Sequence, residues 1–189
     1  MRKIVLASLS PRRYELLSRL GVPFIVDSEN VEEILDPHLP LTKRLEELSY
    51  LKALPVFKRH QDAIVIGADT IVCFEEKLLG KPKNRQDAKK MLLSYSGKSQ
   101  YVYTAVTVLD QNKRISFVSQ SEVCFKPLTE DIIEHYLDEN EWQDKAGGYA
   151  FQGKGASLID HYQGDYDTIV GLPVQRLKEV LENEFEVSF

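Results

Sequence analysis

Features that mark secreted, membrane-spanning or metal-rich proteins are scarce in this sequence. Its 189 residues include only two cysteines, Cys73 and Cys124, and both lie in apolar runs typical of strands, so we expect reduced core residues. No apolar run approaches the roughly 20 residues that a membrane-spanning helix needs. The run Ile4–Ala7 is also far too short for the apolar region of a signal peptide. We therefore expect a cytoplasmic protein without a membrane partner, and the four scattered histidines do not suggest a zinc site.

Basic residues are outnumbered by acidic ones. The chain has 24 Lys and Arg against 29 Asp and Glu, which gives a net charge of −5. Because such a surface repels polyphosphate backbones, the composition argues against binding to a nucleic-acid polymer. A small phosphorylated substrate remains compatible with this charge, because a local cationic pocket can hold it against the overall field.

The pattern of apolar residues predicts an α/β protein. Strands are expected at residues 3–7, 22–26, 63–66, 71–74, 101–109 and 115–125, and helices at 11–20, 42–54, 84–93, 129–137 and 174–181. Ser10, Thr42 and Asn84 are expected to cap three of these helices, Gly21 to end the first, and Pro55 to kink or end the second. Since no linker separates the segments, we predict a single domain over residues 1–189 with a mixed sheet.

The segment Ser8–Arg13 predicts a strand, a turn and a basic helix start. A helix N-terminus presents free amide groups and a partial positive charge, and therefore binds phosphate. Two successive arginines, Arg12 and Arg13, are unfavourable at that end of a helix unless an anion lies beside them. The alternative interpretation is that both arginines are solvated surface charges and that Ser10 and Pro11 only start the helix.

Asp69 follows a buried strand in Gly67–Thr70. A carboxylate there is costly unless it meets a metal ion, a cation or a proton that it can move. The alternative is a turn aspartate that accepts bonds from nearby backbone amides. Lys81 is fixed between two residues that shape the chain, Gly80 and Pro82, and the alternative is an ordinary loop lysine.

A glycine-rich stretch covers residues 144–153. Its glycines let the backbone approach a ligand closely, and Gln152 is a lone amide among the aromatic and glycine neighbours Tyr149, Phe151 and Gly153. The alternative is a flexible surface loop.

Six patches in a fixed order resemble one protein family. They are Ser8-x-Ser10-Pro11-Arg12-Arg13-x-Glu15-Leu16-Leu17, Gly67-Ala68-Asp69-Thr70-Ile71-Val72, Gly80-Lys81-Pro82, Ser96-Gly97, Asp144-Lys145-Ala146-Gly147-x-Tyr149-x-x-Gln152-Gly153 and Gly164-Asp165-Tyr166-x-x-Ile169-Val170-Gly171-Leu172-Pro173. The chain thereby resembles the Maf family, nucleotide pyrophosphatases also labelled septum-formation inhibitors, from about residue 4 to residue 181.

The resemblance implies an elongated mixed sheet flanked by helices, with two lobes around a cleft, similar to the inosine triphosphate pyrophosphatase fold. It also implies a divalent cation, Mg²⁺ or Mn²⁺, and hydrolysis of a nucleoside triphosphate between the α- and β-phosphates. By this likeness Asp69 is the catalytic acid–base residue, and Arg12, Thr70 and Gln152 set nucleotide preference. Other polar positions around the cleft are matched by Ser8, Arg13, Lys52, Lys81 and Glu33, and Glu33 and Asp69 are the candidate metal ligands.

Arg12-Arg13 and Gln152 resemble the branch of the family that acts on dTTP and UTP. A glutamine amide accepts from uracil N3–H and donates to O4, a pair of contacts that neutral cytosine does not match. The sequence departs from the family pattern at Gln100, where His is usual, and at Ala105 and Thr168, where Gly and Asn are usual. These changes bear on substrate range more than on the chemistry.

The expected mechanism holds the triphosphate with Arg12, Arg13, Lys81 and the start of the first helix, while Asp69 either activates water or binds the metal. Two alternatives stay open at this point. One is a nucleotide-sensing protein that acts on cell division through a partner, and the other is a pyrophosphatase for modified purine nucleotides. A homodimer is also left open.

Overall fold

The computed structural model describes residues 2–32 and 36–189, so the candidate metal ligand Glu33 lies outside the described residues. The strands are β1 (Ile4–Leu6), β2 (Ile25–Val26), β3 (Ile64–Phe74), β4 (Lys77–Leu78), β5 (Ser99–Leu109), β6 (Arg114–Phe125) and β7 (Ile159–Gln163). The α-helices are α1 (Pro11–Ser18), α2 (Leu41–Arg59), α3 (Arg85–Tyr95), α4 (Glu130–Asp138), α5 (Tyr166–Val170) and α6 (Val174–Phe185). Two 3₁₀ helices, η1 (Ala146–Gly148) and η2 (Lys154–Leu158), lie between α4 and β7.

The strands form one mixed seven-stranded sheet in the order β2-β1-β3-β5-β6-β7, and β4 pairs with β3. β1 is parallel to both neighbours, with Val5 opposite Ile25 and Val65, whereas the β3–β4 and β6–β7 pairs are antiparallel. The predicted fold class, a mixed sheet flanked by helices, is confirmed. None of the described helices is long and apolar enough to cross a membrane.

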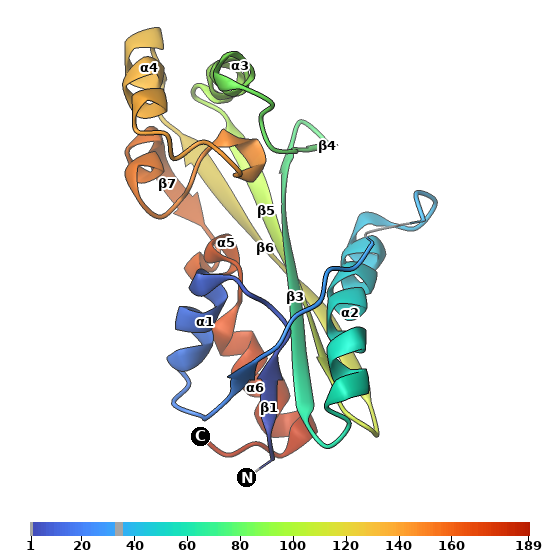
Figure 1. Ribbon diagram of the computed structural model, residues 1–189. Coiled ribbons are helices and arrows are strands. Elements are labelled where there is room, and N and C mark those ends of the chain that lie inside the picture. The colour runs from blue at the N-terminus through green and yellow to red at the C-terminus, as the bar shows by residue number, and fades with distance from the viewer. Residues whose placement is uncertain (1, 33–35) are drawn as a thin grey trace. The chain divides into compact units, whose positions relative to one another are not determined.

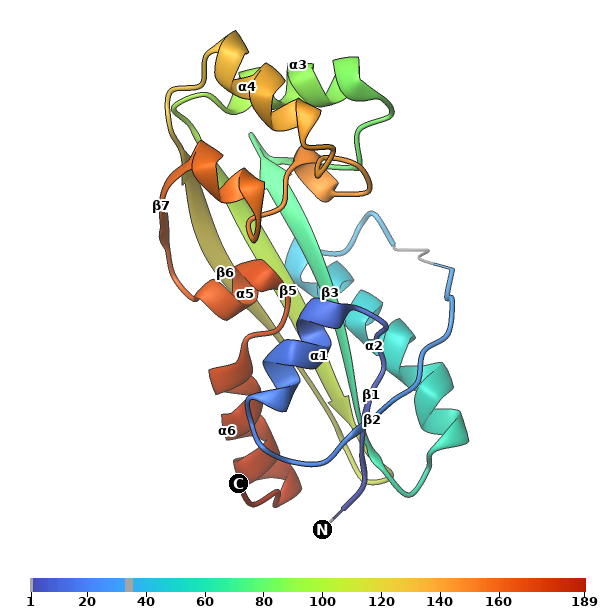
Figure 2. The ribbon, with the colours of Figure 1, turned by 60° about the vertical axis from the view of Figure 1, so that its left-hand side comes forward.

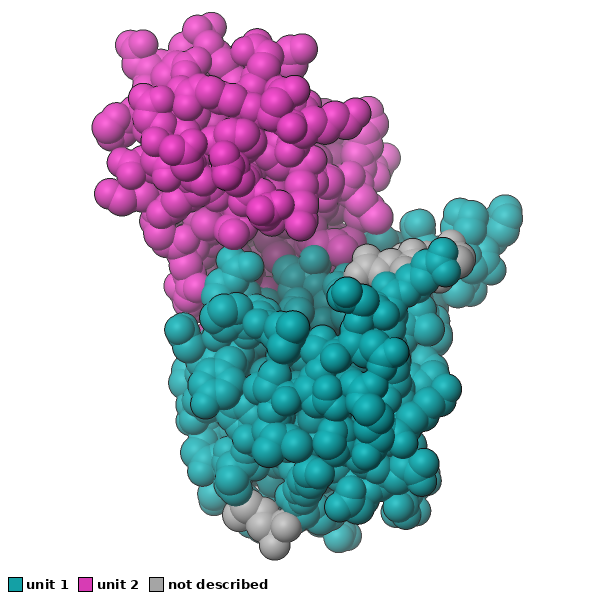
Figure 3. Space-filling view, in the orientation of Figure 1, with its two compact units in different colours: residues 1–70, 104–119, 170–189 teal, residues 71–103, 120–169 magenta. Residues whose placement is uncertain are grey.

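The chain divides into two compact units. Unit 1 comprises residues 1–70, 104–119 and 170–189, and unit 2 comprises residues 71–103 and 120–169 (Figure 3). β3, β5 and β6 each contribute residues to both units. The predicted single domain and the predicted cleft between two lobes stay predictions.

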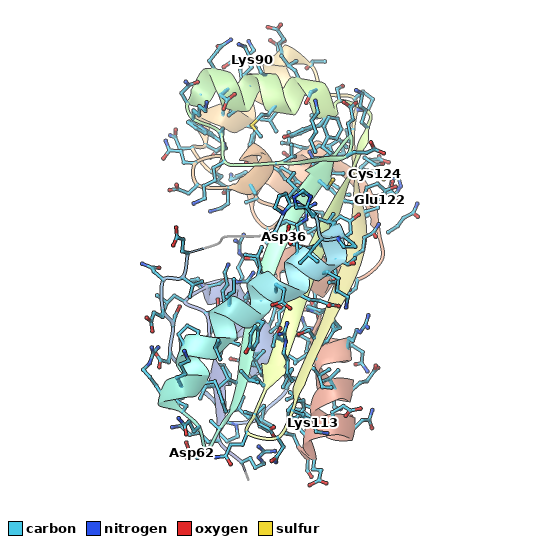
Figure 4. All side chains as sticks on the ribbon, turned by 90° about the vertical axis from the view of Figure 1, so that its right-hand side faces the viewer. Asp36, Asp62, Lys90, Lys113, Glu122 and Cys124 are labelled. Carbon is cyan, nitrogen blue, oxygen red and sulfur yellow. The ribbon has the colours of Figure 1, made fainter. Side chains whose placement is uncertain are left out.

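Unit 1 has helices on both faces of its part of the sheet (Figures 1 and 2). On one face, the strand residues Ile64, Ile66 and Ala68 pack with apolar side chains of α1 and α6. On the other, Val65 packs with residues of α2, including Ala53. Figure 4 looks onto α2, which lies along β3 and is joined to it by the turn that contains Asp62. Alternate residues of β3 therefore meet different helices.

Unit 2 has its own apolar core, built between its strands and α3, α4, η1 and η2. A row of aromatic rings runs through it, with ring centroids 5.0 Å apart for Phe74 and Tyr95, 5.2 Å for Tyr95 and Phe125, and 5.0 Å for Phe125 and Tyr149. Burial raises the pKa of the Tyr149 hydroxyl above its ordinary value. The Tyr149 ring is therefore part of this core.

Several predicted boundaries differ from the structure. The expected strands 63–66 and 71–74 are one strand, β3, so Asp69 lies within a strand rather than at its end. Pro55 does not end α2, which continues to Arg59, and Thr42 lies inside that helix, whose N-cap is Pro40. The predicted strand 22–26 is reduced to two residues, and β4 and β7 were not predicted.

The caps at Ser10 and Asn84 are confirmed, since each side chain accepts a hydrogen bond from a backbone amide three residues ahead. Both cysteines are free thiols. Cys73 is buried as predicted, whereas Cys124, labelled on β6 in Figure 4, is only partly buried and lies 3.2 Å from the Ser99 hydroxyl.

Candidate active site

The carboxyl ends of two parallel strands, β1 and β2, place the first group of candidate residues. β1 ends at Leu6, and the chain continues through Ser8 into α1, where Ser10 caps the helix and Pro11 occupies its first position. Ser8 is buried, and its hydroxyl accepts from the Ser10 amide at 3.2 Å. The predicted strand, turn and helix start are confirmed, and ligands of open α/β sheets bind at this end of the strands.

Arg13 connects three separate segments of unit 1. Its Nε donates to the Gly171 carbonyl at 2.9 Å, Nη1 to the Ser8 hydroxyl at 3.3 Å and Nη2 to the Thr70 hydroxyl at 3.0 Å. Burial lowers the pKa of Arg13 from its ordinary value, while the nearby Asp69 carboxylate acts in the opposite direction. The interpretation of Arg13 as a solvated charge is therefore wrong, because its guanidinium is an internal brace.

Arg12 is different, because it is exposed and has no hydrogen-bond or ion-pair partner among the described residues. A cation at a helix start without a carboxylate partner is placed to bind an anion. Its role in substrate binding stays a prediction.

Asp69 and Thr70 project to opposite faces of β3, since successive side chains of a strand alternate. On the face of α1 and α6, the Thr70 hydroxyl accepts from Arg13 and lies 2.8 Å from the buried hydroxyl of Thr104 on β5. On the face of α2, the Asp69 carboxylate contacts the Lys52 ammonium. One strand therefore presents a hydroxyl to one helix layer and a carboxylate to the other.

Gly67 explains how Lys52 reaches Asp69. A Cβ atom at Gly67 would lie 2.4 Å from the Ser49 carbonyl oxygen and 2.9 Å from Ala53, so only glycine lets α2 approach β3 this closely. Asp69 is two residues further along the same face of the strand, beside the turn of α2 that carries Lys52. Pro55 does not disturb this contact, because α2 passes through it without ending.

The Lys52–Asp69 pair is largely shielded from solvent, with side-chain exposures of 23% for Lys52 and 11% for Asp69. Lys52 contacts Oδ1 of the carboxylate. Within the described part of the chain, Oδ2 has no hydrogen-bond donor, so this oxygen is available to a water molecule or a metal ion. The arrangement is a positioned carboxylate with one oxygen fixed and the other available.

A pocket of about 200 Å³ opens beside these residues in unit 1. It is lined by Ala7, Ser8, Leu9, Arg13, Ser28, Glu29, Asn30, Val31 and Lys52. Two of these side chains are cationic, and the pocket lies just beyond the carboxyl ends of β1 and β2. Such a pocket suits an anionic group such as a phosphate.

Residues 28–31 of this lining were missed by the sequence analysis. They follow a strand of two residues and show no periodicity that could mark them. Thr104 was missed too, because a threonine inside an apolar strand is ordinary in sequence and only its partner Thr70 gives it significance.

The oxygen donors fit a divalent ion only in part. Across residues 2–32 and 36–189, no group of three or more His, Cys, Asp or Glu side chains gathers to form a metal cage. Asp69 offers one oxygen, and Mg²⁺ is commonly held by one or two carboxylates together with substrate phosphates. The Asp69 carboxylate therefore fits an ion that the substrate helps to bind.

Two further candidates belong to unit 2. Lys81 is exposed, and its ammonium lies 3.9 Å from the exposed carboxylate of Asp144. Gln152 is also exposed, and its Nε2 donates to the Tyr166 hydroxyl at 3.4 Å. The structure thus brings together Ser8, Arg13, Lys52, Asp69 and Thr70 in unit 1, whereas Lys81 and Gln152 lie in unit 2.

Gln152 stands beside an aromatic cluster made of Phe151, Tyr162 and Tyr166. Its ring centroids are 5.7 to 5.9 Å apart. Tyr162 and Tyr166 are 43% and 38% exposed, so faces of these rings are open to a planar ligand.

Comparison with known proteins shows the family of the chain. Residues 3–184 match the family model described as Maf-like protein. Curated relatives named dTTP/UTP pyrophosphatase, from Bacillus anthracis (strain CDC 684 / NRRL 3495) and Bacillus cereus (strain ZK / E33L), are 46% identical over 182 residues, covering 96% of this chain and 95% of theirs. Among solved structures, the Ham1 protein of Staphylococcus aureus aligns with 97% of this chain and 100% of its own at 12% identity and a TM-score of 0.49. Since the family model spans nearly the whole sequence, the chain belongs to the Maf-like protein family.

Proposed function

We propose that this protein hydrolyses dTTP and UTP to the nucleoside monophosphate and pyrophosphate. The observation that carries the proposal is the 46% identity, over 96% of the chain, to relatives named dTTP/UTP pyrophosphatase. The site supports it with a shielded carboxylate, a neighbouring lysine and a small cationic pocket in unit 1. Substrate selection, metal dependence and the role of each residue are parts of the same proposal.

In the proposed reaction a water oxygen attacks the α-phosphorus. A new phosphorus–oxygen bond forms there, and the bond from the α-phosphorus to the oxygen that bridges it to the β-phosphorus breaks, which releases pyrophosphate. Asp69 orients the water and takes its proton on Oδ2, while Lys52 holds Oδ1 and so fixes the direction of the carboxylate. Because the Lys52–Asp69 ion pair is already formed in a shielded site, these two side chains need little reorganisation when the reaction occurs.

The phosphates are held by cations at the start of α1. Arg12 contacts them directly in the proposal, since its side chain is exposed and no described residue pairs with it. Arg13 fixes the Ser8 and Thr70 hydroxyls that face the substrate. Lys81, a residue of unit 2, is the other cation proposed as a phosphate ligand. A divalent cation, Mg²⁺ or Mn²⁺, bound by the phosphates would neutralise charge on the leaving pyrophosphate, and Asp69 would be its ligand in the alternative to the role as base.

Gln152 selects the base in the proposal. Its amide accepts from N3–H of uracil or thymine and donates to O4, and the rings of Tyr162 and Tyr166 offer faces for stacking. A cytosine presents the reverse pattern, with an acceptor at N3 and a donor at N4, so both contacts are lost unless the amide flips.

The deciding experiment is a panel of nucleoside triphosphates with detection of pyrophosphate, with and without Mg²⁺ or Mn²⁺. We expect rapid release from UTP and dTTP with metal, slow release from CTP and dCTP, and none without metal. Binding of nucleotides without turnover would instead support the nucleotide-sensing protein. A preference for modified purine triphosphates would support the other alternative. The substrate inside the cell, a cytoplasmic location and a homodimer are outside the reach of this assay and stay predictions.

A further inference from the structure

One wall of the pocket in unit 1 is formed by a segment without regular structure. Residues 28–31 line the pocket directly after β2. Their backbone joins the sheet through the Asp27 amide, which donates to the Leu6 carbonyl at 3.2 Å. A wall with so little secondary structure depends on its side-chain contacts to keep its shape.

A single guanidinium, that of Arg59 at the end of α2, supplies two such contacts. Its Nε and Nη2 each donate to the Asp27 carboxylate at 3.0 Å, which is the bidentate arrangement. Its Nη1 donates to the carboxylate of Glu29, which itself lines the pocket. Arg59 therefore holds the two acidic residues on either side of Ser28.

His60 and Lys3 add to the same anchor. The Lys3 ammonium lies 3.0 Å from His60 Nδ1, and because an ammonium has no lone pair it must donate to that nitrogen. The ring proton is then on Nε2, which donates to the Asp27 carboxylate at 2.9 Å. Asp27 thus accepts from Arg59 and His60, and these bonds lower its pKa from 3.8 to about 2.

We propose that Arg59 is a positioning residue for nucleotide binding, although it lies beyond Lys52, at the C-terminal end of α2. It fixes the wall at residues 28–31, and it neutralises the Glu29 carboxylate, which would otherwise repel a phosphate in the pocket. The inference rests on the proposed function, because the ligand of the pocket is the triphosphate. It adds a residue that no motif of the family pattern contains.

Arg85 in unit 2 provides a matched control. Its side chain is 42% exposed against 41% for Arg59, and it too donates to two carboxylates, those of Glu134 and Asp138. Both carboxylates belong to α4, which its own backbone bonds hold in shape. Loss of Arg85 therefore removes surface ion pairs of the same kind, whereas loss of Arg59 also removes the side-chain contacts that hold residues 28–31 in place.

The experiment compares Arg59→Ala and Arg85→Ala with the parent enzyme. For UTP hydrolysis at saturating Mg²⁺, we expect Arg59→Ala to raise KM about fivefold while kcat changes less than about twofold. Arg85→Ala should leave both values unchanged. In the Arg59→Ala background, Glu29→Gln should recover only part of the lost affinity, because it removes the repulsion without restoring the anchor.

Amide hydrogen exchange gives a readout that does not depend on activity. Arg59→Ala should speed exchange in peptides that cover residues 27–32 and leave those from β1 unchanged, and Arg85→Ala should do neither. Parent-like KM and exchange in Arg59→Ala would overturn the inference. An inactive parent enzyme would overturn the proposed function instead, and the exchange experiment would still decide whether Arg59 anchors the wall.

Discussion

Replacing Asp69 with asparagine tests the centre of the proposed mechanism. The change keeps the shape of the side chain and removes its charge and its ability to take a proton. A positioned general base contributes about 10²- to 10⁴-fold to a rate, so kcat for UTP should fall by at least about 10²-fold. Such a fall corresponds to about 2.7 kcal/mol of activation free energy.

The cost in stability should be smaller. Lys52 loses an ionic partner, but its side chain remains 23% exposed and the asparagine carbonyl still accepts its hydrogen bond. We expect the free energy of unfolding to fall by about 1 kcal/mol, which leaves the variant folded. The expected rise in activation free energy is larger than the expected fall in the free energy of unfolding, so a loss of catalysis can be told apart from a loss of folded protein.

The assay is pyrophosphate release across a range of UTP and Mg²⁺ concentrations, together with urea unfolding. Asp110→Asn is the control, because Asp110 is also a buried aspartate of unit 1 and forms an ion pair with Arg2. It should lose stability and keep kcat. If Asp69 acts chiefly as a metal ligand, Asp69→Asn will need more Mg²⁺ and regain activity as Mg²⁺ rises. A folded Asp69→Asn enzyme with near-parent kcat would refute both roles.

Three shorter predictions concern phosphate binding, base selection and pH. Arg12→Ala and Lys81→Ala should each lower kcat/KM by a similar factor for every nucleotide. Added salt should weaken binding of nucleotides to the parent enzyme. A loss confined to nucleotides of one base would mean that the residue recognises the base. Gln152→Glu should reduce the preference for UTP over CTP by about 1–3 kcal/mol, and an unchanged ratio of kcat/KM would leave Gln152 without a role in selection. Asp27 has a lowered pKa, so its bond to Arg59 should stabilise the fold fully above pH 3.8 and fail as the pH falls through about 2. Urea unfolding of the parent and Asp27→Asn at pH 7, 4 and 2 measures this, and a difference at pH 2 as large as that at pH 7 would contradict it.

The parts of the site that depend on local chemistry could be predicted from the sequence. Ser10 and Pro11 start α1 because a hydroxyl cap and a proline at the first position act within one turn. Asn84 starts α3 for the same reason. These features need no knowledge of residues far away in the chain.

Prediction failed where distant segments override local preference. Gly67 and Asp69 disfavour strands, and the sequence analysis therefore placed a break there. In the structure the strand continues, because β5 pairs with it and because Gly67 is needed where α2 approaches. The residue that looked like a strand breaker is the one that brings Lys52 to Asp69.

The pocket wall at residues 28–31 could be predicted from the sequence even less. Asp27 and Arg59 are separated by 32 positions, and no periodicity or motif connects them. Surface arginines are common, so Arg59 gave no signal until its two acceptors were seen beside the pocket. A contact of this kind can be found only when the backbone has been placed.

The contrast between the two neighbouring arginines gives the last prediction. Arg13→Lys keeps the positive charge but has one compact ammonium, which cannot reach the Ser8 hydroxyl, the Thr70 hydroxyl and the Gly171 carbonyl together. Leaving such acceptors unpaired costs about 1–3 kcal/mol, so the variant should unfold at a lower urea concentration and lose kcat/KM for every nucleotide. Arg12→Lys should keep its stability within about 0.5 kcal/mol, because Arg12 is exposed and no described residue pairs with it. If Arg13→Lys were as stable as Arg12→Lys and lost only substrate affinity, Arg13 would be a phosphate ligand, and the brace would have no energetic significance.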